Sequence, residues 1–158
     1  MIFPFEIKYS KKLVGEIESF STHEILESYR KDFEKSCADS VRFIENGLIA
    51  ENRLFEINFK PGLNWNRWGG VSKARLLVIE NNNKRIAIYT FNLTRIFVVG
   101  AIAGVFFGLI SKFYLVGIFA FVVLGIFNWV AKLIQHRITF VSVIDNLIYE
   151  RKRNLSSK

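Results

Sequence analysis

The first ten residues alternate between apolar and polar side chains, a pattern of period two. Successive side chains of a β-strand point to opposite faces, so the alternation predicts a strand with one buried face. Pro4 favours a strand start or a sheet edge, because proline has no amide hydrogen to donate to a neighbouring strand. The next apolar positions fit either a short helix or a strand, and the pattern leaves both open: Leu13, Val14, Ile17 and Phe20.

A helix is predicted from Ser21 to about Ser36. Ser21 and Glu24 have the spacing of a capping box, in which each side chain accepts a hydrogen bond from the backbone amide of the other residue. Behind this start, four apolar residues fall on one face of the helix: Ile25, Leu26, Tyr29 and Phe33.

Strand patterns dominate residues 41–91. Asn46-Gly47 is typical of a type I′ hairpin turn, and the asparagines of residues 81–84 tolerate the positive φ of a tight turn. With the first strand, these patterns predict a small α+β domain over residues 1–93, an antiparallel sheet of about four to five strands with one or two helices. The predicted strands of this region lie at 41–43, 55–59, 74–80 and 85–91.

A long apolar run follows. Ile96 to Ile134 are 39 residues with only two formal charges, Lys112 and Lys132. One helix of this length would measure about 58 Å, whereas a bilayer core takes about 20 helical residues. The run is interrupted at Ser111–Tyr114, and it lacks the polar stripe that a hairpin in a soluble protein normally carries. We therefore predict a two-helix transmembrane hairpin over residues 94–134, with its helices at 94–110 and 115–133.

The formal net charge of +8 lies mostly beside this apolar run. Residues 1–93 hold 14 Lys/Arg against 12 Asp/Glu, whereas residues 94–158 hold 8 against 2. A nucleic-acid binder concentrates positive charge on its folded face, so the distribution favours anionic lipid headgroups and excludes nucleic acid. Only Lys112 lies in the connecting loop, so the positive-inside rule predicts two spans with both termini in the cytoplasm. The expected headgroup contacts are Arg95, Lys132, Arg137, Arg151, Lys152 and Arg153.

Glycines recur every fourth residue on the first predicted span. Gly100, Gly104 and Gly108 lie on one face and permit close approach of another helix. The four-residue loop already brings the second span against the first, so we favour packing between the two spans, with Gly117 and Gly125 in the contact. The alternative is a homo-oligomer interface or a pore seam.

Residues 135–158 are predicted to form a C-terminal amphipathic helix and a basic tail. The β-branched residues of 138–144 leave a strand open. If helical, this segment either covers the sheet or lies on the lipid headgroups, and we favour the sheet because an open sheet face needs a cover. The apolar positions of the helix are Phe140, Val143, Ile144, Leu147 and Ile148.

The loop of residues 60–70 combines two tryptophans, an arginine and three glycines. Trp65 and Trp68 fit three roles: capping the small core, contacting the membrane interface together with Arg67, or binding a ligand by stacking. The sequence leaves these three interpretations open.

Catalytic and metal-binding patterns are lacking. Cys37 is the single cysteine, and the two histidines, His23 and His136, have no HxxxH or CxxC spacing around them. We interpret both histidines as solvated surface residues. Neither a phosphate-binding loop nor GxSxG occurs. We therefore predict no enzyme, no cofactor and no metal.

These patterns favour a non-enzymatic, membrane-anchored binding or scaffolding module whose cytoplasmic domain engages a protein or lipid partner. The alternative is a self-assembling membrane protein that alters permeability through its glycine-rich helix face. The order of elements resembles a helix-grip arrangement with a membrane hairpin inserted before its final helix.

Overall fold

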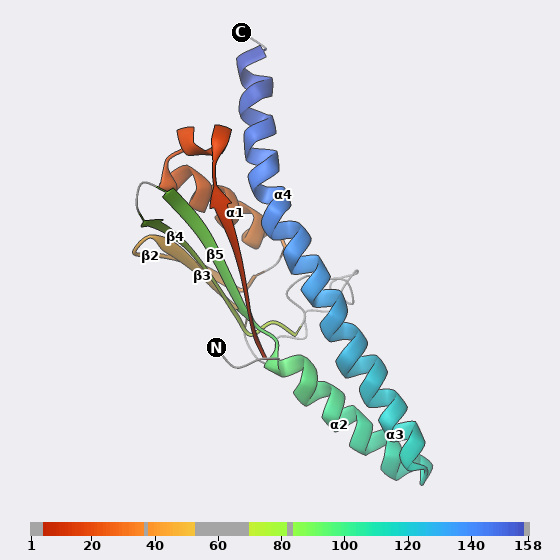
Figure 1. Cartoon of the computed structure of the whole chain (residues 1–158). Helices are drawn as coiled ribbons and strands as arrows, with labels where there is room; N and C mark the ends of the chain where they lie inside the picture. Colours follow the sequence, from red (N-terminus) through yellow and green to blue (C-terminus); the bar gives the residue numbers. More distant parts are fainter. Residues whose placement is uncertain (1–4, 37, 53–69, 82–83, 157–158) are drawn as a thin grey trace.

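The computed structural model describes residues 5–36, 38–52, 70–81 and 84–156. It is an α+β fold with an antiparallel sheet and a long C-terminal helix (Figure 1). The N-terminal elements are β1 (Glu6–Leu13), the 3₁₀ helix η1 (Gly15–Ser19), α1 (Thr22–Lys35), β2 (Ser40–Ile44), β3 (Gly47–Glu51), β4 (Lys73–Asn81) and β5 (Lys84–Asn92). The C-terminal elements are α2 (Thr94–Ser111), α3 (Tyr114–Phe121), the π-helix η3 (Val122–Phe127) and α4 (Asn128–Ser156).

The five strands form one sheet in the order β1-β5-β4-β3-β2, with every neighbouring pair antiparallel. The predicted antiparallel sheet is therefore confirmed. The stretch that sequence left open after β1 is the 3₁₀ helix η1. The strand predicted at 55–59 lies outside the described residues. β1 pairs with β5 from Glu6↔Asn92 to Leu13↔Arg85, so the first strand lies directly beside the strand that leads into α2.

A hairpin turn forms between β2 and β3 at the predicted place. β3 itself (Gly47–Glu51) was not among the predicted strands, and the turn is not the expected type I′. That turn requires positive φ at both central residues. Ile44 pairs with Gly47, so the central residues are Glu45 and Asn46, and of these two only Asn46 has a positive φ, 53°. Gly47 is needed for another reason. A Cβ at this position would lie 2.3 Å from the carbonyl oxygen of Leu76 on β4.

The predicted capping box of α1 is present. The Glu24 amide donates to Ser21 Oγ at 3.1 Å, and the Ser21 amide donates to Glu24 Oε2 at 2.7 Å. The hydrogen bond from the Ser21 amide, followed by one from the Ser21 side chain, stabilises the ionised carboxylate and holds the pKa of Glu24 below its ordinary value.

Ser21→Ala is expected to lower the free energy of unfolding by about 1 kcal/mol, because it leaves an amide of the first helical turn unpaired. Thermal or denaturant unfolding monitored by circular dichroism measures the change. Ser10→Ala, at an exposed position of β1, is the control and should leave the midpoint unchanged. Equal effects of the two substitutions would contradict a capping contribution.

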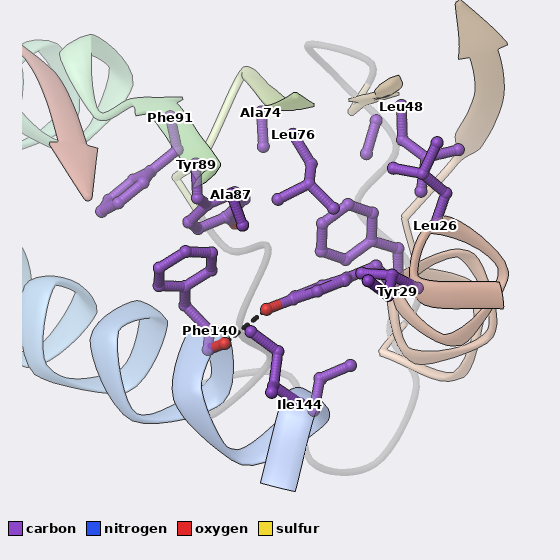
Figure 2. Close-up of a cluster of buried hydrophobic side chains, with 14 of the residues drawn as sticks. Leu26, Tyr29, Leu48, Ala74, Leu76, Ala87, Tyr89, Phe91, Phe140 and Ile144 are labelled. Carbon is purple, nitrogen blue, oxygen red and sulfur yellow. Dashed lines mark hydrogen bonds between the residues drawn. The ribbon is translucent and has the colours of Figure 1, made fainter. Parts of the chain in front are cut away.

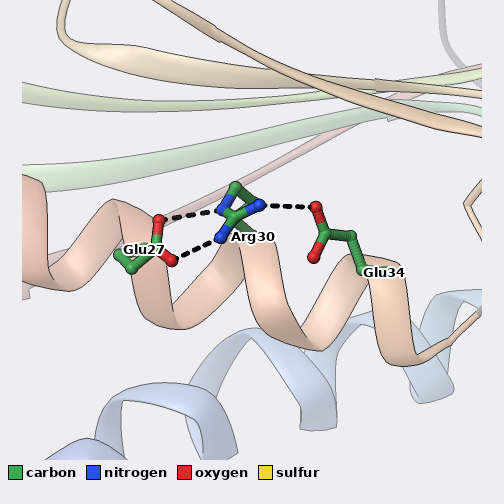
Figure 3. Close-up of polar contacts among 3 residues, drawn as sticks. All are labelled: Glu27, Arg30 and Glu34. Atoms are coloured by element: carbon green, nitrogen blue, oxygen red, sulfur yellow. Dashed lines mark hydrogen bonds and ion pairs between the residues drawn. The ribbon is translucent and has the colours of Figure 1, made fainter.

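The outer face of α1 carries an ion-pair ladder. Figure 3 shows Arg30 between Glu27, three residues before it, and Glu34, four residues after it. The guanidinium donates to both oxygens of Glu27, at 2.6 and 2.8 Å, and to Glu34 at 2.8 Å. The contact lowers the pKa of Glu27 and raises that of Arg30. This face of the helix is therefore polar and turned to solvent.

One face of the sheet is covered by α1 and α4 together. Figure 2 shows Tyr29 of α1 and Phe140 of α4 pointing toward one another on the side of the sheet that carries Leu76 and Tyr89. The Tyr29 hydroxyl donates to the carbonyl oxygen of Phe140, and the rings of Phe140 and Tyr89 stack with centroids 5.6 Å apart. The C-terminal segment is thus a helix that covers the sheet.

The second helix of the hairpin does not end where it was predicted to end. α3, η3 and α4 run as one helical rod over Tyr114–Ser156, 43 residues, whereas the sequence predicted an end at residue 133 and a separate helix after it. No proline or glycine lies between Asn128 and Ser156 to stop the helix. The rod therefore runs without a break from the apolar hairpin to the part of α4 that covers the sheet (Figure 1).

Candidate functional site

The candidate site is the apolar hairpin and the place where it joins the sheet. α2 and the rod are both long and apolar enough to cross a membrane. Only 17% and 11% of their most apolar 18-residue stretches are buried inside the protein, unlike the core helix of a soluble protein. Large side chains are exposed on several sides of the hairpin, including Val99, Ile102, Phe106, Leu109, Ile110, Leu115, Ile118, Phe119 and Phe127.

The tip of the hairpin is a tight turn. Lys112 has φ 56°, and the hydroxyl of Ser111 bonds to the carbonyl oxygen of Phe107 at 2.7 Å and receives the amide of Phe113 at 3.3 Å. The first helix ends at Ser111 and the second begins at Tyr114, each one residue from its predicted boundary. The two helices consequently lie side by side along their length (Figure 1).

The five glycines named from the sequence lie along the contact between these helices. A Cβ built on Gly100 would lie 2.7 Å from the Cα of Gly125, and one built on Gly117 would lie 2.5 Å from the carbonyl oxygen of Gly104. Gly108 is less crowded, because its Cβ would meet the Cα of Gly117 at 3.5 Å, an ordinary contact. Within the described residues, the glycine face thus packs inside the hairpin.

The interpretation of His136 as a solvated residue is wrong. Its side chain is fully buried, its Nδ1 is hydrogen-bonded to the Tyr89 hydroxyl at 2.7 Å, and its ring stacks on Phe91 with centroids 4.4 Å apart. The sheet covers this side of α4, which sequence reasoning placed at the membrane boundary. His23, by contrast, is exposed and stacks on Phe43.

The base of the hairpin is tied to the sheet by further polar contacts. The Tyr9 hydroxyl of β1 donates to the carbonyl oxygen of Leu133 at 3.0 Å, and burial raises the pKa of this tyrosine. The two helices of the hairpin also touch here, because the ring of Trp129 of α4 lies beside that of Phe97 of α2. Trp129, Leu133 and His136 lie on consecutive turns of α4, so the base of the hairpin and the sheet are in contact over this length of the helix.

The residues predicted to contact lipid headgroups do not lie together. Lys132 is buried with an exposed fraction of 6%, and its ammonium donates to Gln135 at 3.3 Å. Lys132 is therefore not exposed in the folded chain, as a headgroup contact would require. Arg95 lies at the start of α2 and donates to the carbonyl oxygen of Asn52 at 2.7 Å. Arg137 is exposed on α4.

The other three basic residues belong to the far end of α4. Arg151 bonds to Ser19 and lies over the ring of Phe20, and Lys152 pairs with Glu16 at 2.8 Å. From Leu133 to Arg151 the helix rises about 27 Å. Arg151, Lys152 and Arg153 therefore cannot share one headgroup layer with Arg95 when α4 continues straight out of a membrane.

The face of the sheet opposite α1 and α4 carries a hollow of about 610 Å³. Its lining includes the apolar residues Leu77, Ile79 and Ile88 and the charged residues Glu6, Lys8, Lys73 and Arg75. Beside it, Glu51 accepts from Lys73 at 2.9 Å and from Arg42 at 3.3 Å, and the Lys73 contact lowers the pKa of Glu51.

The tryptophan loop, with Trp65, Arg67 and Trp68, lies outside the described residues. Among residues 5–36, 38–52, 70–81 and 84–156, no three His, Cys, Asp or Glu side chains gather as a metal site would require. No family model, no curated protein and no solved structure matches the chain.

Proposed function

We propose that the chain is an integral membrane protein, anchored by the hairpin of α2 and α3, that serves as a non-enzymatic binding or scaffolding module. The observation that carries the proposal is the apolar surface of the hairpin, which is exposed on several sides rather than buried in a core. In water such a continuous exposed surface is strongly unfavourable, whereas in hydrocarbon it is the expected surface of a span.

Both ends of the chain face the cytoplasm in this proposal. The hairpin brings the start of α2 and the end of the span in the rod to the same side. The positive charges near these ends, Arg95 and Arg137, outnumber the single Lys112 of the tip. The α+β domain then lies at the inner leaflet, and the rod fixes its position relative to the membrane.

The domain is proposed to bind a protein or lipid partner through the open face of its sheet. The lining of the hollow supports this role, because it combines apolar residues such as Leu77 and Ile88 with an excess of basic residues such as Lys8 and Arg75. The alternative of a glycine-lined assembly that alters permeability loses its support, because the glycines are occupied by the contact between α2 and the rod.

Membrane insertion and orientation can be tested together in a Cys37→Ser background, which removes the single native thiol. The protein should stay in the membrane pellet after alkaline carbonate extraction. A membrane-impermeant maleimide added to intact cells should label Lys112→Cys at the tip, and should label Lys152→Cys only after permeabilisation. Both positions are exposed, so accessibility within the fold is matched. Recovery in the soluble fraction would refute insertion, and the reverse labelling pattern would refute the orientation.

A further inference from the structure

The open face of the sheet, opposite α1 and α4, carries a block of four apolar side chains. The strand register places Leu77 of β4 beside Ile88 of β5, and Ile79 beside Ile86. Because side chains alternate between the two faces of a strand, all four share the open face, whereas the residues between them are buried on the helix side. Ile79 keeps 42% of its surface exposed, and the hollow of about 610 Å³ lies over part of this apolar block.

Basic side chains border the apolar block. Lys8 and Arg75 both pair with Thr90, one step along the sheet from the block, and Lys12 lies beside Ile86. In the part of the chain that the structure describes, none of these three cations is bonded to a carboxylate. The strands place six basic residues on the open face against two acidic ones, namely Lys8, Lys12, Arg42, Lys73, Arg75 and Lys84 against Glu6 and Glu51.

This excess of positive charge around an apolar block selects an acidic partner that is also apolar. A second copy docked through the same face does not satisfy it, because the cations of one copy would lie against those of the other. Single-stranded nucleic acid is bound on sheets by aromatic side chains that stack on its bases. Among the described residues of the strands, none of the side chains on the open face is aromatic.

The open face stands upright on the membrane. This step rests on the proposed function, in which α4 leaves the membrane near residue 133. From there α4 runs beside the strands (Figure 1), because His136 stacks on Phe91 and Phe140 stacks on Tyr89 one step farther along β5. The strands therefore rise away from the bilayer together with the helix, and the open face is turned sideways rather than toward the lipid.

The end of the open face nearest the bilayer is also its acidic end. Glu6 pairs with Asn92, two residues before α2 begins, and Glu51 pairs with Lys73 at the same end of the sheet. Lys12, six residues after Glu6 on β1, lies about 20 Å farther from α2. A flat bilayer would thus meet both carboxylates and could not reach all the cations that border the apolar block.

We propose that the open face binds an acidic, amphipathic segment of another protein. The apolar side chains of that segment pack on Leu77, Ile79, Ile86 and Ile88, and its carboxylates pair with Lys8, Lys12 and Arg75. This names the partner class of the binding role proposed above, and it assigns the charges on the open face to protein recognition rather than to lipid.

A model peptide tests the charge and the location together. The full chain in phosphatidylcholine nanodiscs is titrated with a fluorescent amphipathic peptide of leucine and glutamate, with empty nanodiscs as the blank. The peptide should bind, and Lys8→Glu combined with Arg75→Glu should weaken binding by about tenfold. Lys31→Glu combined with Lys35→Glu makes the same change in net charge at exposed positions of α1 and should leave the affinity unchanged. Absence of binding, or equal losses in the two double variants, would overturn the proposal.

A fluorophore on the open face distinguishes a protein-bound face from a lipid-bound one. Ser10 is exposed and lies beside Ile88, so bimane on Ser10→Cys, in the Cys37→Ser chain, should shift to the blue when the peptide is added. Nitroxide-labelled headgroups in phosphatidylglycerol nanodiscs should quench bimane on Lys112→Cys at the tip of the hairpin, but not bimane on Ser10→Cys. Quenching at Ser10→Cys would overturn the proposal in favour of lipid. Absence of quenching at Lys112→Cys would instead refute the membrane insertion on which the proposed function rests.

Discussion

Replacing His136 with alanine is expected to lower the free energy of unfolding by about 3 kcal/mol, the range found for large buried side chains cut back to alanine. The side chain is fully buried between the sheet and α4. Its removal leaves a cavity beneath the ring of Phe91, and it leaves the buried Tyr89 hydroxyl without the Nδ1 partner that lies 2.7 Å away. Both effects act in the same direction.

Guanidinium unfolding of the detergent-solubilised full chain, followed by fluorescence and circular dichroism, measures this loss. Arg137→Ala is the matched control, because Arg137 is the next residue on the same helix and is exposed; its midpoint should stay close to that of the parent. Tyr89→Phe should have a smaller effect of about 1 kcal/mol, since the ring stays and only the hydrogen bond is lost. A His136→Ala midpoint equal to that of Arg137→Ala would show that the buried contact is not part of the folded state.

Much of the domain could be predicted because its signals are local. The alternation of β1, the capping box of α1 and the strand runs of β4 and β5 depend on residues within a few positions of one another. The pairing of strands does not. Glu6 lies beside Asn92, and nothing in a period-two pattern states which distant strand is the neighbour.

The burial of two polar residues of α4 was not predicted from the sequence. Lys132 and His136 are polar, so the sequence placed them at a membrane or water boundary. Both are buried in the fold, and His136 lies against the sheet, where the hydroxyl of Tyr89, 47 residues earlier in the chain, is hydrogen-bonded to it. Residues 132, 136, 140, 143 and 147 do share one helical face across the predicted boundary. That continuity was the signal that would have predicted one uninterrupted helix.

The contact made by the glycines could be predicted from the sequence only in part. Their four-residue spacing predicted a close helix contact, and the short loop favoured the second helix of the same chain as the partner. Spacing alone made Gly100, Gly104 and Gly108 equivalent. The structure distinguishes them, because the helices cross most closely where Gly100 meets Gly125 and where Gly117 meets Gly104.

Gly117→Ala should therefore destabilise the hairpin, whereas Gly108→Ala on the facing helix should not. The new methyl group at position 117 would lie 2.5 Å from the carbonyl oxygen of Gly104, a backbone atom that moves only if the helices separate. Overpacking of this kind lowers stability by about 1–3 kcal/mol. At position 108 the methyl group meets the Cα of Gly117 at 3.5 Å, within ordinary van der Waals distance. Both variants add one methyl group to the same interface, so hydrophobicity is matched.

Thermal unfolding in detergent should show a lower midpoint for Gly117→Ala. A similar fall is expected for Gly100→Ala, whose methyl group would lie 2.7 Å from the Cα of Gly125. Equal midpoints for the variants at 117 and 108 would mean that the two helices do not pack at the distance described.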